Sequence, residues 1–329
     1  MSATPPSAAV TLGTRASKLA RAQTDGVVEL LAAAWPGLAC DVRPFVTQGD
    51  RTQASGEPLP EIGGKGLFTL ELERALLDRE IDLAVHSLKD LPTEDAPGVV
   101  IGAICLRMDV RDCLVARDGL TLAELPRGSV VGTSSLRREA QLRAQRPDLE
   151  IRSIRGNVDT RVDKVRRGEY DAAVLAAAGI RRLGLEDVVT EWLEPATMLP
   201  APGQGALAVQ CRSDDQRALE LLAAINDPAS RVATAAERTF LRELGGGCAA
   251  PVAAHAEVVA KGDDDASNSL LQGAGRVRMN GLVASIDGSK VVRVRGEGEA
   301  EELGSRLARE ALAAGADAIL EAIRLGVTP

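Results

Sequence analysis

The chain has 329 residues, a formal net charge of −8, 45% hydrophobic residues and 26% charged residues. These values exclude a disordered chain and a small scaffold that depends on disulfides, and they predict two or three domains. Only six residues are aromatic, which argues against single-stranded nucleic-acid binding, because that function uses aromatic stacking surfaces. No apolar run reaches the roughly 18 residues of a membrane span, and residues 1–9 do not resemble a signal peptide.

The cysteines indicate a reducing compartment. All five are widely spaced and none belongs to a C-x-x-C pair, which favours reduced thiols over a disulfide framework. The chain has only two histidines, so its composition gives no indication of a metal site. We therefore expect a cytoplasmic protein without a bound metal.

The first third of the chain alternates short apolar runs with amphipathic segments, as is typical of α/β domains. The first helix is expected to end at Trp35-Pro36-Gly37, because proline cannot continue a helix and glycine favours a turn. The pattern predicts strands at residues 10–14, 41–46, 82–86 and 99–103, and helices at residues 17–34 and 67–79.

The alternation starts again near residue 129 and predicts a second, similar domain. A further strand at residues 206–211 can return to the first sheet. Two such domains predict a cleft, and ligands of open α/β sheets bind beyond the carboxyl ends of the strands. The second block is expected to have strands at residues 129–132, 151–154 and 172–175, and helices at residues 136–144 and 158–167.

The last third has a different pattern, which predicts a smaller α+β domain. We expect helices at residues 214–225, 230–244 and 301–325, and strands at residues 252–259, 270–279 and 290–294. The predicted fold class is therefore α/β, with two domains that form a cleft and a small C-terminal α+β domain. The expected boundaries are residues 8–105 with 206–223 for domain 1, 106–205 for domain 2 and 224–329 for domain 3.

Positive charge is concentrated in one part of this acidic chain. Between Arg127 and Arg182, 13 lysines and arginines oppose 7 acidic residues. Such a segment predicts either a site for a polyanion or a set of solvated helix faces. We favour a binding role for arginines next to glycine, serine or threonine at the ends of the predicted elements. The solvated interpretation applies to Arg143, Arg146, Arg166 and Arg167.

Three predicted strand-to-helix junctions carry arginine beside small or hydroxyl residues. They lie at residues 13–17, 132–138 and 154–161. Backbone N–H groups and the helix dipole favour a carboxylate or phosphate at such a junction, and arginine adds bidentate donors. Simple N-capping by Ser134 or Ser135 is the alternative, and it is compatible with anion binding. Three converging junctions would bind several carboxylates.

Asp90 follows the predicted strand at residues 82–86, directly after Lys89. A carboxylate at the carboxyl end of a strand is well placed for acid–base chemistry, with a pKa set by burial and by the lysine. The alternative is a solvated loop with one ion pair. We do not expect His86, Ser87 and Asp90 to form a triad, because triad groups normally converge from separate segments.

Cys248 follows three glycines at the end of a predicted helix. The glycines can terminate the helix, which would make the cysteine incidental. A thiol on an exposed flexible loop would instead be available for covalent attachment. Spacing alone favours the incidental cysteine. The other glycine-rich segment, residues 62–68, lacks the G-x-x-x-x-G-K-[ST] pattern of a phosphate-binding loop.

Taken together, these segments closely resemble the porphobilinogen deaminase family of tetrapyrrole biosynthesis. The motifs occur in the family's order between residue 11 and about residue 255, and the remaining residues suit the family's third domain. The matching motifs are GTRASKLA at 13–20, GGKGLF at 63–68, VHSLKD at 85–90, VGTSSLRR at 131–138, RGNV at 155–158, LPAPGQGA at 199–206 and GGGCA at 245–249.

The resemblance implies a cleft between two domains like those of periplasmic binding proteins, with a small third domain. It implies a transferase that adds four porphobilinogen units head to tail, each with loss of ammonia, and releases hydroxymethylbilane by hydrolysis. The chain would grow on a dipyrromethane cofactor that is assembled from substrate. In the family a cysteine holds this cofactor by a thioether bond, and Cys248 matches that cysteine.

The resemblance also implies roles for individual residues. Asp90 matches the catalytic aspartate, which hydrogen-bonds pyrrole N–H groups and stabilises positive, azafulvene-like intermediates. The acetate and propionate of each pyrrole unit account for the arginine-rich junctions. Cofactor-binding positions are matched by Ser17, Lys89, Asp90, Thr133, Ser135, Arg137, Arg138, Arg155 and Gly156. Substrate-binding positions are matched by Arg15, Arg155, Arg161 and Arg182, and by Lys65 and Phe68 of the family's mobile loop.

Two other classes of protein are possible on this sequence. A non-enzymatic polycarboxylate-binding protein would explain the arginines but not Asp90 or Cys248, and a secretory signal would support it. A transcription-factor effector domain would be attached to a DNA-binding helix-turn-helix, whereas this chain begins with a predicted strand. We therefore expect an enzyme, a cytoplasmic monomer whose partner is the small molecule porphobilinogen, with neither nucleic acid nor membrane as a partner.

Overall fold

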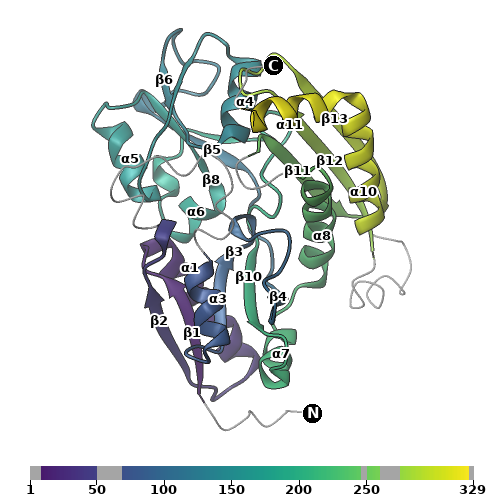
Figure 1. Cartoon of the computed structure of the whole chain (residues 1–329). Coiled ribbons are helices and arrows are strands. Elements are labelled where there is room, and N and C mark those ends of the chain that lie inside the picture. Colours follow the sequence, from purple (N-terminus) through teal and green to yellow (C-terminus); the bar gives the residue numbers. More distant parts are fainter. Residues whose placement is uncertain (1–8, 50–68, 246–249, 260–274, 326–329) are drawn as a thin grey trace. The chain divides into compact units, whose positions relative to one another are not determined.

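The computed structural model describes residues 9–49, 69–245, 250–259 and 275–325, which form three sheets (Figure 1). Contacts divide the chain into two compact units, each described by itself below. The first unit comprises residues 1–59, 64–108 and 206–231, and the second comprises residues 60–63, 109–205 and 232–329. Within the described residues, no helix has both the length and the apolar character needed to span a membrane.

The first unit is built on a five-stranded sheet with helices on both faces. Its strands, in spatial order, are β2 (Cys40–Phe45), β1 (Val10–Arg15), β3 (Leu83–Ser87), β10 (Leu207–Arg212) and β4 (Val99–Ile104). Strands β2, β1 and β3 are parallel, and β10 is antiparallel to β3 and β4. The helices are α1 (Lys18–Ala34), α3 (Leu70–Leu77) and α7 (Gln216–Ala223).

Alternation along β3 explains this layering. Leu83 and Val85 share one buried cluster with the apolar residues of α1 and α7, whereas Ala84 packs with α3. Successive side chains of a strand point to opposite faces, so a strand buried on both sides has a continuous apolar sequence. The expected return of the strand at 206–211 to the first sheet is confirmed by the pairing of β10 with β3.

The second unit contains a sheet with the same pattern of pairing. Its strands, in spatial order, are β7 (Glu150–Arg152), β6 (Val130–Gly132), β8 (Ala172–Ala176), β5 (Asp112–Ala116) and β9 (Glu191–Leu193). Strands β7, β6 and β8 are parallel, and β5 is antiparallel to β8 and β9. Leu142 of α4 (Leu136–Gln145) packs on one face, and α5 (Val158–Arg166) and α6 (Ala177–Arg182) pack on the other.

The matching sheets confirm the predicted fold class of two α/β domains with a small C-terminal α+β region. The boundaries of the three predicted domains remain a prediction. Strands β5 and β9 were not expected from the sequence. β5 begins with the fully buried Asp112, and a charge at the start of a short strand hides its apolar pattern.

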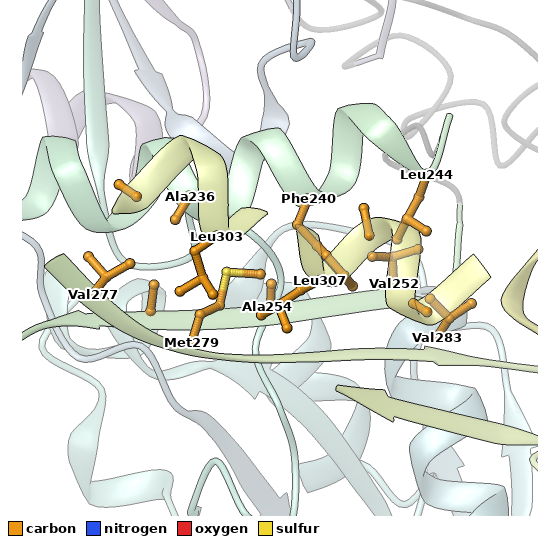
Figure 2. Close-up of a cluster of buried hydrophobic side chains, with 14 of the residues drawn as sticks. Ala236, Phe240, Leu244, Val252, Ala254, Val277, Met279, Val283, Leu303 and Leu307 are labelled. Carbon is orange, nitrogen blue, oxygen red and sulfur yellow. The ribbon is translucent and has the colours of Figure 1, made fainter. Parts of the chain in front are cut away.

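The C-terminal part of the second unit is an antiparallel sheet of β11 (Val252–Val258), β12 (Arg276–Ala284) and β13 (Val291–Glu299). Helices α8 (Pro228–Glu243), α10 (Ala300–Ala311) and α11 (Asp317–Arg324) supply apolar side chains to one buried cluster with this sheet (Figure 2). The single helix predicted for residues 301–325 is broken by a π-turn at Leu312–Ala316, where Gly315 has a φ of +101°.

Phe240 of α8 is the largest side chain of this cluster, and it is fully buried (Figure 2). Gly281 of β12 makes room for its ring, since a Cβ there would lie 2.7 Å from Phe240 Cζ. We expect Phe240→Ala to lower the free energy of unfolding by about 3–5 kcal/mol through lost burial and the cavity left behind. Urea denaturation monitored by circular dichroism measures this change.

Leu325→Ala is the control, because that side chain is 70% exposed and its loss should cost no more than about 0.5 kcal/mol. Equal stability losses in the two variants would show that Phe240 is not a principal support of the C-terminal sheet.

Candidate functional site

Asp90 lies immediately beyond the carboxyl end of β3, in a short 3₁₀ turn, Leu88–Asp90. Buried Leu88 anchors the turn, and its N–H donates to the carbonyl of Ala206 over 3.0 Å. Ser87 accepts a 2.8 Å hydrogen bond from Gln23 of α1. The half-buried Asp90 carboxylate makes no hydrogen bond or ion pair with another described residue. Backbone contacts and packing therefore hold the turn without the carboxylate.

Arg15 ends β1 and Ser17 follows it at the same edge of the sheet, because β1 and β3 are parallel neighbours. Ser17 is the N-cap of α1 and accepts a 3.2 Å hydrogen bond from the Ala20 N–H. The Arg15 charge reaches His86, whose pKa is lowered to about 4, first by burial and then by this guanidinium. His86 is therefore a neutral, buried histidine at neutral pH.

In the second unit, the N-terminus of α4 follows β6 through Thr133, Ser134 and Ser135. Ser135 occupies the N-cap position, as expected, but its side chain makes no capping hydrogen bond. Ser134 instead donates to the carbonyl of Ile154 over 2.7 Å, and the Ser135 N–H donates to Thr133 Oγ1 over 3.2 Å. The Ser135 hydroxyl at the positive end of a helix thus remains available for an anion.

Arg137 and Arg138 are both buried, and they share one carboxylate. Asp112 of β5 accepts 2.8 Å and 2.7 Å hydrogen bonds from Arg137 Nη1 and Arg138 Nη2. Arg137 Nη1 also donates to the Leu199 carbonyl, and Arg138 Nη1 to the Val174 carbonyl. The Nε atom of each arginine is buried without a partner in the described structure. Two buried guanidinium groups therefore share one buried carboxylate, and the Nε–H group of each arginine is a further donor.

The sequence motifs predict that these two arginines donate to a ligand, and they give no indication of Asp112. Two arginines hold the pKa of its carboxyl group well below its usual range, despite burial. The available signal was an acidic residue at the head of an otherwise apolar run, residues 112–116. A buried acid needs a cationic partner, and adjacent arginines supply it here.

Arg155, Gly156 and Arg161 form the next junction. Gly156 has a φ of +109°, and a Cβ there would lie 2.7 Å from Thr160 Cγ2, so the turn requires glycine. Arg161 Nε donates to the Gly156 carbonyl over 2.8 Å. The pKa of Arg161 is lowered to about 10 by burial and by the charges of Arg138 and Arg155. No ion pair joins Arg155 or Arg161 to a carboxylate of the described residues.

This arrangement fits a ligand with several carboxylates. Guanidinium groups that lie close together in a partly buried site are stabilised when anions bind among them. The dipyrromethane cofactor and porphobilinogen both have this chemistry, since each pyrrole bears an acetate and a propionate. The residues of this junction therefore match the cofactor that the sequence motifs imply.

The remaining predicted residues are distributed as follows. Arg182 ends α6, and its Nη2 donates to the Gly205 carbonyl over 3.0 Å. Lys65, Phe68 and Cys248 lie outside the described residues. The arginines assigned to solvated faces pair with nearby acids: Arg143 with Glu139, Arg146 with Asp148, Arg166 with Asp163 and Arg167 with Glu169.

Comparisons with known proteins agree with these observations. The family model "Porphobilinogen deaminase, dipyromethane cofactor binding domain" matches residues 10–220, and "Porphobilinogen deaminase, C-terminal domain" matches residues 232–313. Porphobilinogen deaminase of Roseiflexus castenholzii is 49% identical over 94% of this chain and 98% of its own length. That of Deinococcus radiodurans is 46% identical over 96% of this chain and 99% of its own length.

Among solved structures, a putative periplasmic sulfonate-binding protein of Methylobacillus flagellatus is similar, with a TM-score of 0.39 and 15% identity over 68% of this chain and 66% of that chain. The sequence relatives are far more similar and extend over almost the whole chain. On the family models and these relatives, the chain belongs to the porphobilinogen deaminase family.

Proposed function

We propose that the chain is a hydroxymethylbilane synthase that acts as a cytoplasmic monomer in tetrapyrrole biosynthesis. It joins four porphobilinogen molecules head to tail with release of ammonia and then releases the linear product by hydrolysis. The arginine cluster of the second unit carries this proposal. Arg161 lies close enough to Arg138 and Arg155 for their charges to lower its pKa, no carboxylate of the described residues pairs with Arg155 or Arg161, and the substrate has two carboxylates on each ring.

The dipyrromethane cofactor supplies, when bound, the covalently held pyrrole to which the first substrate molecule is joined. Arg137, Arg138, Arg155, Thr133 and Ser135 are the residues of the second unit that would hold its carboxylates. Guanidiniums and a helix N-terminus act here through charge-assisted hydrogen bonds. The free thiols of the four described cysteines support a reducing, cytoplasmic location.

Covalent attachment is assigned to Cys248, and the other cysteines support this by elimination. Cys105, Cys113 and Cys211 are at most 2% exposed, and burial raises the pKa of Cys113 to about 12 and that of Cys211 to about 11. The half-buried Cys40 also has a raised pKa, through burial and then the adjacent Asp41. Because the thiolate is the reactive form, the raised pKa values make Cys40, Cys113 and Cys211 poor nucleophiles, and Cys105 is buried.

Asp90 is assigned the catalytic role. Positive charge develops on the pyrrole as porphobilinogen loses ammonia, and an unpaired carboxylate beside the ring stabilises that charge. The same oxygens can accept the pyrrole N–H and hold a proton during coupling. The firm anchoring of the turn through Leu88 keeps the carboxylate in place without using it internally.

A non-enzymatic polycarboxylate-binding protein is the competing function. A binding protein would use the arginine cluster in the same way, but it would give Asp90 and Cys248 no role. Family membership favours the enzyme, since the relatives of almost equal length are named as deaminases.

We expect Asp90→Asn to fold normally and to lower kcat by about 10²–10³, because the amide cannot stabilise developing positive charge. Ammonia release from porphobilinogen measures the rate, and circular dichroism checks the fold. Asp78→Asn, at the exposed C-cap of α3, is the control and should retain wild-type kcat. Near-normal turnover by Asp90→Asn would remove Asp90 from the mechanism.

We expect Cys248→Ala to carry no pyrrole adduct, because it lacks the thiol that forms the bond. Intact mass of the denatured protein, followed by peptide mapping, detects the two-pyrrole increment. Cys40→Ala should keep the adduct at full occupancy. An increment on a different cysteine in the Cys248→Ala protein would overturn the assignment.

We expect Arg161→Gln to raise the KM for porphobilinogen by about 10-fold or more, which corresponds to the loss of a charge-assisted hydrogen bond to a carboxylate. Arg166→Gln is the matched control, because that arginine lies on the same helix and pairs with Asp163 on its exposed face. Steady-state kinetics compare the two variants. Equal KM values would place Arg161 outside the binding site.

A further inference from the structure

A chain of buried polar contacts extends from the arginines of α4 to the segment that precedes β10. Gln204 is fully buried, and its Nε2 donates to Asp112 Oδ1 over 2.9 Å and to the Val110 carbonyl over 2.8 Å. Asp112 is the same carboxylate that holds Arg137 and Arg138. The Gln204 amide therefore fixes the position of the anion on which both arginines depend.

Gly203, the residue before Gln204, continues the chain of contacts to α8. The Gly203 N–H donates to Glu237 Oε2 over 2.7 Å, and Glu237 Oε1 accepts from the Ala256 N–H of β11, also over 2.7 Å. Glu237 is fully buried on α8. Gly203 has a φ of +75°, which favours glycine where the backbone turns its N–H toward this carboxylate. All of these residues belong to the second unit.

The place of α8 in the sequence, shortly before Cys248, suggests that these contacts do more than stabilise the interior. The helix ends at Glu243, and Cys248 follows five residues later in the sequence. If Cys248 holds the cofactor and α4 holds its carboxylates, then the covalent and ionic attachments of one molecule come from segments far apart in sequence. Both must be held at a fixed separation for the cofactor to satisfy them together.

Stability alone is a weak reason for such a network. Buried ion pairs and their hydrogen-bonding partners are often replaceable by apolar residues without loss of stability, whereas they can fix one arrangement among several. Here one carboxylate serves two arginines and an amide, and a second carboxylate joins a loop to a strand. The contacts specify how α4, α8 and β11 are placed relative to one another within the second unit.

We propose that Gln204 is a positioning residue for the cofactor: together with Glu237, it holds the arginines of α4 in register with the helix that leads to Cys248. The proposal rests on the function proposed above and adds a residue that touches neither cofactor nor substrate. It predicts that loss of the Gln204 amide slows cofactor assembly more than it harms the fold.

Gln204→Met tests this, because methionine has a similar length and volume but cannot donate to Asp112. The full-length protein is produced in a host that makes no porphobilinogen and is then incubated with porphobilinogen. Intact-mass spectrometry follows the gain of the two-pyrrole increment. We expect the rate of gain to fall by about 10-fold or more, and the KM for turnover by the fully loaded fraction to rise more than kcat falls.

Gln210→Met is the matched control. Gln210 is also buried, 1% exposed, but it lies on β10 in the first unit, where its amide contacts Glu73. The control should gain the increment at the wild-type rate, and thermal melting of both variants reports any general loss of stability. Equal rates of gain in folded Gln204→Met and Gln210→Met would overturn the proposal.

Two further outcomes are separable. A wild-type protein that gains no increment and releases no ammonia would overturn the proposed function itself. If Gln204→Met does not fold, Glu237→Gln takes its place, since an amide there can accept from only one of the two backbone N–H groups that now meet the carboxylate. Slow assembly is expected again, and a wild-type rate in the folded variant would overturn the proposal.

Discussion

The Asp112 carboxylate is buried between two guanidinium groups, and the properties of the second unit depend on this shortage of negative charge. One anion cannot balance Arg137 and Arg138, and Arg161 lies close enough to Arg138 and Arg155 for their charges to lower its pKa. In a partly buried site such charges repel strongly, and a ligand with several carboxylates relieves the repulsion. Asp112 partly offsets the repulsion between Arg137 and Arg138 and keeps these two side chains oriented.

The first unit has a carboxylate, that of Asp90, which makes no hydrogen bond or ion pair with another described residue. Leu88 and the backbone of the turn hold Asp90 in place, so its charge is not consumed by the fold. The anion for chemistry and the cations for recognition thus come from different units of the chain.

Much of the fold and part of the site could be predicted from sequence. Alternating apolar runs placed β1, β3, β6 and β8 correctly, and hydroxyl residues before apolar periodicity placed the starts of α1 and α4. These features depend on local periodicity and capping, which nearby residues determine. The motifs around Asp90 and Cys248 carried the family resemblance, because they combine unusual residues at fixed spacing.

The tertiary structure alone decided which groups meet. A buried carboxylate at the start of a short strand is tolerated only when arginines from elsewhere in the chain neutralise it. The sequence around Asp112 gives no indication of these arginines, so Asp112 could not be predicted. The same holds for Gln204 and Glu237, whose partners lie on other elements. Periodicity and motif spacing determined the elements and the family, whereas the pairing of buried charges depends on contacts between residues far apart in the chain.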